Sequence, residues 1–150
     1  MKTILTALLL AIGFITPSMA HDEGHGPKLS DTAKYGGAIA PAILAKEVPL
    51  GRKAKMIYKG ELTRSQNGTI RIYIYDTQMK LIDLEKFDTT ATGTLEFKKN
   101  KKWAKTPFKL QQKDNAFVGK IPPVTRKPFN IDVILREGNH DIMIAFDHLD

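Results

Sequence analysis

The chain has 150 residues, no cysteine and a formal net charge of +7. A chain of this length fits one domain, and folding at that size buries roughly two-thirds of the unfolded chain's surface. The absence of cysteine excludes disulfides, thiolate metal sites and cysteine nucleophiles.

Residues 1–20 have the layout of a secretory signal peptide. Lys2 gives a positively charged start, residues 4–15 form an apolar run, and Ser18 and Ala20 supply small residues before a cleavage point. The apolar run is too short for a transmembrane helix, which needs about 20 residues. We therefore expect cleavage after Ala20 and a soluble periplasmic protein of 150 − 20 = 130 residues, with no transmembrane segment.

Removing the leader takes away only Lys2, so the net charge of +7 becomes +6 in the mature chain. Export argues against nucleic acid as the partner for this charge. Anionic lipid headgroups, cell-wall polymers or an acidic protein fit better. The alternative is that the charge only keeps the protein in solution.

The beginning of the mature chain is polar. Residues 21–35 are rich in glycine, proline, serine and charged side chains, so we predict a flexible tail that buries too little to order itself. Residues 38–48 are more apolar, but Pro41 interrupts them. We expect an irregular edge strand there, because proline breaks regular helices.

From residue 54 onward, apolar and polar residues alternate with the period of two that is typical of strands. Ile70, Ile72 and Ile74 are the clearest case, since each is followed by a more polar neighbour. About seven strands with turns between them favour an antiparallel sandwich or barrel. We predict an all-β, immunoglobulin-like sandwich over residues 36–150, with strands at 54–62, 69–75, 92–98, 103–111, 116–121, 129–135 and 141–147.

The new N-terminus is the segment with the most metal-binding chemistry. Cleavage would expose the amine of His21, which can chelate a metal together with its ring Nδ1, and His25, Asp22 and Glu23 could complete the site. Imidazole nitrogen suits copper, zinc and nickel. The alternative is a solvated tail whose histidines are incidental.

Two residues elsewhere are weaker metal candidates. His148 lies among carboxylates near the C-terminus, where a fraying chain end is the alternative. Met79 lies in an expected turn, and its thioether would select Cu(I) if exposed. Packing in the core is the usual role of methionine.

Residues 98–105 predict a basic hairpin tip. It carries Lys98, Lys99, Lys101, Lys102, Trp103 and Lys105. An anionic surface or an acidic protein could bind there; the alternative is a solvated turn that protects a sheet edge from aggregation. No Ser-His-Asp arrangement, GxSxG motif or glycine-rich phosphate loop is evident, so we expect no enzyme activity.

Several stretches together resemble a known group of proteins. They are residues 35–37 (YGG), 70–76 (IRIYIYD), 93–97 (GTLEF), 117–120 (FVGK) and 129–133 (FNIDV). This series is similar to small periplasmic β-sandwich proteins of Gram-negative bacteria that are associated with heavy-metal efflux. The HDEGH start resembles the N-termini of periplasmic adaptor subunits of copper and cobalt-zinc-cadmium exporters. His21 also matches copper-carrying sandwich proteins that begin with histidine.

The resemblance implies metal handling and no defined catalytic residues. The functional hypothesis is therefore a periplasmic accessory protein that captures or buffers a transition metal, copper or zinc, for an efflux-system component. The alternative hypothesis is a non-catalytic envelope module that binds a protein partner or an anionic surface through the basic hairpin tip.

Overall fold

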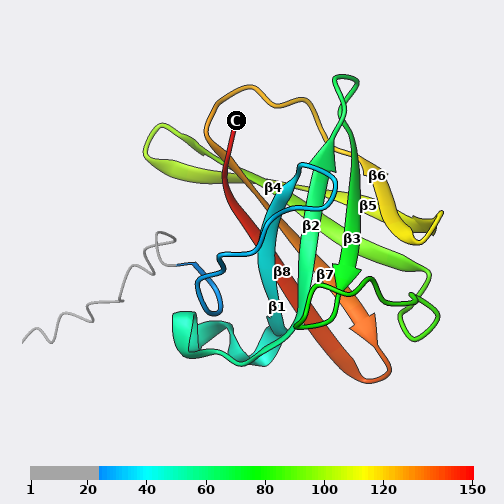
Figure 1. The fold of residues 1–150 in the computed structure, drawn as a ribbon. Helices are drawn as coiled ribbons and strands as arrows, with labels where there is room; N and C mark the ends of the chain where they lie inside the picture. Colours follow the sequence, from blue (N-terminus) through cyan, green and yellow to red (C-terminus); the bar gives the residue numbers. More distant parts are fainter. Residues whose placement is uncertain (1–23) are drawn as a thin grey trace, which may run out of the picture.

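The computed structural model describes residues 24–150 (Figure 1). The predicted signal peptide, its cleavage point and the candidate ligands His21, Asp22 and Glu23 lie outside the described residues. The described chain forms one closed antiparallel barrel with the strand order β1-β2-β3-β6-β5-β4-β7-β8. The strands are β1 (Ala38–Leu44), β2 (Met56–Arg64), β3 (Thr69–Tyr75), β4 (Thr90–Lys99), β5 (Lys102–Lys113), β6 (Ala116–Lys120), β7 (Phe129–Glu137) and β8 (His140–Leu149).

The all-β prediction is confirmed, but the immunoglobulin-like sandwich of about seven strands is not what the structure forms. The additional strand is β1, which pairs with β2 along most of its length and with β8 through Ala42, Ile43 and Leu44. It is therefore not an edge strand. Pro41 is accommodated because β8 pairs with β1 only beyond it, where no hydrogen bond from the proline nitrogen is needed. A 3₁₀ segment, η1 (Ala45–Lys53), then leads to β2.

Tight turns with left-handed backbone join several strands. Asn100 and Lys101 have φ values of 51° and 63°, and Asp114 and Asn115 have values of 51° and 56°. Two successive residues with positive φ match the two-residue hairpin that suits the twist of paired strands. The lysine-rich stretch predicted as a hairpin tip is accordingly the turn between β4 and β5.

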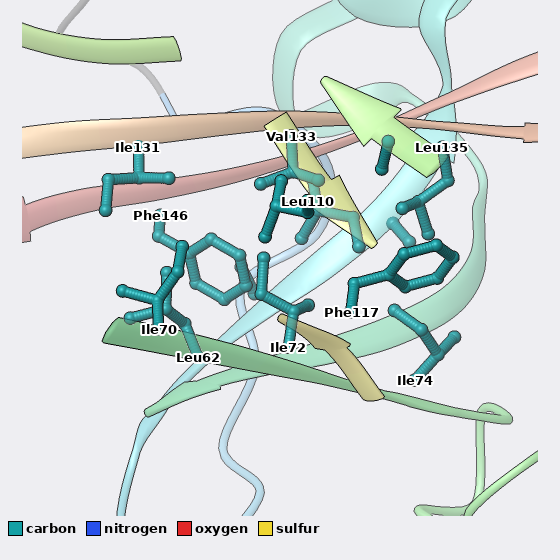
Figure 2. Packing of buried hydrophobic residues seen from close by; sticks show 14 of the residues in the cluster. Leu62, Ile70, Ile72, Ile74, Leu110, Phe117, Ile131, Val133, Leu135 and Phe146 are labelled. Carbon is teal, nitrogen blue, oxygen red and sulfur yellow. The ribbon is translucent and has the colours of Figure 1, made fainter. Parts of the chain in front are cut away.

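The barrel interior is filled by side chains from alternate strand positions. Figure 2 shows Ile70, Ile72 and Ile74 of β3 facing Ile131 and Val133 of β7 across this core. All five side chains are fully buried, as the alternation predicts for the β3 isoleucines. Because the interior is packed, the chemistry available to a partner lies on the outer surface of the barrel.

Candidate functional site

The β4–β5 hairpin is longer than its neighbours. Strand β7 pairs with β4 only over residues 92–96, and β6 pairs with β5 only from Leu110 onward. Residues 97–109, here called the basic arm, therefore pair only with each other or with β4. In Figure 1 the arm's yellow-green loop extends from the barrel at the left.

The arm concentrates positive charge. Between Phe97 and Lys113 the sequence contains seven lysines and no acidic residue. All seven lysines are exposed; Lys113 lies in β5 beyond the arm, and the six in the arm are Lys98, Lys99, Lys101, Lys102, Lys105 and Lys109. Trp103 is half-buried beside them, with the Lys98 Nζ 5.4 Å from the centroid of its ring. The structure thus places all the predicted basic-tip residues on one projecting hairpin.

One carboxylate anchors the arm to the barrel. Glu96 is only 2% exposed, and its Oε1 lies 2.6 Å from the Nζ of Lys105. Among residues 24–150, Lys105 is the one lysine of the arm with an ion pair. The other arm lysines are therefore available to an external anion.

Two further carboxylates, Asp132 of β7 and Asp147 of β8, lie near the root of the arm. Burial raises the pKa of Asp132 to about 7, and the negative charges of Glu96 and Asp147 add to this effect while Lys105 opposes it. Sequence alternation gives no sign of this shift, because it depends on carboxylates from three different strands. The net charge beside the arm therefore changes near neutral pH.

A separate feature surrounds His25. This residue lines a hollow of about 310 Å³ together with Lys28, Arg52 and Asp147. The His25 Nδ1 is buried and has no hydrogen-bond partner among residues 24–150. The adjacent Gly26 holds the segment in place, because its N–H donates to the Gly51 carbonyl at 3.0 Å.

The remaining metal candidates do not gather at this hollow. Met79 does lie in a turn, where its φ is 64°, but the residue is only 9% exposed, so it packs in the core as methionine usually does. His148 is exposed, and its backbone N–H donates to the Asn130 Oδ1 at 3.0 Å. Within residues 24–150, no group of three or more His, Cys, Asp or Glu side chains is arranged to hold a metal ion.

The segment predicted as a flexible tail lies along the barrel wall in its described part. Glu61 of β2 is fully buried and accepts hydrogen bonds from the backbone N–H groups of Lys34, Tyr35 and Gly37 at 3.0, 2.7 and 3.0 Å. The Tyr75 hydroxyl donates a fourth bond at 2.9 Å. Burial alone would raise the pKa of Glu61, but these donors outweigh it and lower the pKa.

A buried cation completes this attachment. The Lys59 Nζ lies 2.8 Å from a carboxylate oxygen of Asp31, and Lys59 is only 5% exposed. Sequence analysis gives no role to Lys59 or Glu61. Their one signal is that two charged residues alternate with apolar ones inside an otherwise regular strand. Both hold the N-terminal segment against β2.

No helix among residues 24–150 is long and apolar enough to cross a membrane. Comparisons with known proteins found no matching family model, no matching curated protein and no matching solved structure. Any assignment of function therefore depends on the geometry of the arm and of the His25 hollow.

Proposed function

We propose that this protein is a non-catalytic binding module that attaches to an anionic partner through the basic arm. The observation that carries this proposal is the projecting hairpin, residues 97–109, which has six exposed lysines and no acidic residue. This function is the second of the two hypotheses drawn from the sequence, and the geometry favours it over the first.

Physical chemistry explains how the arm would work. Lysines on a hairpin clear of the barrel wall add their fields together, which raises the local concentration of anions and speeds encounter. Each lysine close to an anionic lipid surface contributes about 1 kcal/mol. Exposed charges are screened over about 10 Å at 0.1 M salt, so the attraction should weaken steeply as salt is added.

The test uses the chain that begins at His21. Trp103 is the one tryptophan of the protein, so its fluorescence reports directly on the arm. The chain is titrated with polyglutamate and with vesicles containing phosphatidylglycerol, at low and high salt, and vesicles of phosphatidylcholine serve as the uncharged reference.

A charge-reversed variant, K101E/K102E, is compared with K53E/K55E, which makes the same charge change at two exposed lysines outside the arm. We expect salt-sensitive binding that the arm variant loses and the control variant keeps. Equal losses in both variants would mean that net charge alone is responsible. Binding that ignores salt and both substitutions would overturn the proposal.

A second candidate function is metal capture, as the resemblance implies. The observation that favours it is the buried His25 Nδ1 without a hydrogen-bond partner among residues 24–150. An unpaired buried ring nitrogen is costly unless something binds it, and imidazole nitrogen suits copper or zinc. His21, Asp22 and Glu23 would supply the further ligands of this site. The protein would then pass the bound metal to an efflux-system component.

Isothermal titration of Cu(II) and Zn(II) into the chain that begins at His21 tests this candidate. A one-to-one site lost both in His25→Ala and when a residue is added before His21 would support it. Unchanged affinity in both would exclude this site. The exposed His140 provides a matched control, because His140→Ala should leave the binding unaltered.

A further inference from the structure

Part of the arm is an unpaired sheet edge. Residues 104–108 of β5 pair with β4 on one side, whereas β6 begins to pair with β5 only at Leu110. No backbone hydrogen bond of the described chain reaches the other side of residues 104–108. Lys105, Thr106 and Pro107 are all exposed, so no described segment covers this edge.

The direction of the backbone groups follows from the neighbouring pairs. Gln112 donates its N–H to the Thr89 carbonyl on the β4 side. Alternate residues of a strand direct their backbone groups to opposite neighbours, so the even-numbered residues of β5 bond toward β4. Lys105 therefore directs its N–H and C=O toward the open edge. Pro107 directs only a C=O there, because proline has no N–H.

The charge around this edge selects the occupant. A second copy of the chain would bring its own lysines against these lysines, and like charges directly opposite in a sheet are destabilising. An acidic strand would instead place carboxylates beside Lys105 and Lys109. A lipid surface could neutralise the lysines but offers no extended row of peptide groups.

We propose that an extended acidic segment of another protein adds to this edge as a strand beside residues 104–108. This inference rests on the proposed function and names its partner class. Main-chain hydrogen bonds would supply part of the affinity, and charged side chains would supply selectivity. The opposing view is that Lys105 and Pro107 exist only to blunt the edge; an edge that is blunted in this way would reject acidic strands too.

The probe is a ten-residue peptide of alternating glutamate and threonine. Its control has the same composition and charge but alternating D and L residues, which prevents a regular strand. Binding is followed through Trp103 fluorescence, and amide hydrogen exchange is followed at Lys105. Two variants separate backbone from charge: Lys105→Pro removes the N–H at the open edge, and Lys105→Thr keeps it.

We expect the all-L peptide to bind roughly tenfold more tightly than the D,L peptide, because a peptide that cannot form a regular strand loses main-chain hydrogen bonds to the edge. Exchange at Lys105 should slow on binding, and Lys105→Pro should bind the L peptide more weakly than Lys105→Thr. Equal binding of both peptides would overturn strand addition while leaving the proposed function intact. Binding of phosphatidylglycerol vesicles but of neither peptide would do the same. No binding of peptides, polyglutamate or vesicles would overturn both.

Discussion

Glu61→Gln is the substitution whose consequence can be worked out in most detail. In the wild type, one carboxylate oxygen accepts hydrogen bonds from the backbone N–H groups of Tyr35 and Gly37. The other accepts hydrogen bonds from the backbone N–H of Lys34 and from the Tyr75 hydroxyl. A glutamine can keep one oxygen in place, but its NH₂ group then faces two donors. The tyrosine hydroxyl can rotate to accept, whereas the backbone N–H of Lys34 cannot.

The expected cost follows from this count. One part-buried N–H without an acceptor costs about 1 kcal/mol, toward the low end of the range for buried groups, and the remaining bonds weaken because the acceptor is no longer charged. We expect the free energy of unfolding to fall by about 2 kcal/mol at pH 7. Most of the loss should appear first as detachment of residues 31–37 from β2, because those bonds attach this segment.

Urea unfolding and amide hydrogen exchange measure the two effects. The amides of Lys34, Tyr35 and Gly37 should exchange faster in Glu61→Gln and stay unchanged in the control Glu85→Gln, an exposed position. The folded-state pKa of Glu61 is lowered, so its stabilising effect is present above the unfolded pKa of about 4.3. It is lost as the pH falls through the folded value. Equal urea midpoints and exchange rates at pH 7 would refute this reasoning.

Three other predictions concern the arm and the core. Because Asp132 has its pKa raised to about 7, the stability associated with its protonated form is present below about pH 4 and lost as the pH rises through 7. Asp132→Asn should therefore gain roughly 1–3 kcal/mol over the wild type between pH 4 and 8, allowing for partial exposure, as judged from urea midpoints. Gly93→Ala should cost about 1–3 kcal/mol in thermal or urea unfolding, because a methyl there would overlap the Phe108 ring; an unchanged midpoint would show that the ring moves aside. K101E/K102E should reduce anion binding steeply at low salt and change the free energy of unfolding, measured in urea, by no more than about 0.5 kcal/mol, since both residues are exposed.

Local patterns in the sequence predict the local parts of this fold. The alternation of Ile70, Ile72 and Ile74 predicts β3 and its buried face, and the lysine-rich stretch predicts the β4–β5 turn. Barrel closure depends on contacts distant in sequence. The pairing of β1 with β8 joins residues about a hundred positions apart, and the proline in β1 conceals that strand from pattern analysis.

The candidate site shows the same division. The charge of the arm can be predicted from the sequence, because lysines in a hairpin turn are exposed wherever the hairpin lies. Its projection and its open edge cannot, since they depend on where β6 and β7 stop pairing. The attachment of the N-terminal segment is also concealed, because backbone amides in a polar stretch find an acceptor, Glu61, that lies 24 to 27 positions along the chain.

Chemical-shift mapping would locate the binding surface without any substitution. Backbone amide resonances of the chain that begins at His21 are recorded while polyglutamate is added at low salt. If the basic arm is the binding surface, the chemical-shift changes should be concentrated in residues 97–109 and should be reversed by salt. Shifts concentrated around His25 and Arg52, or spread evenly over the barrel, would contradict it.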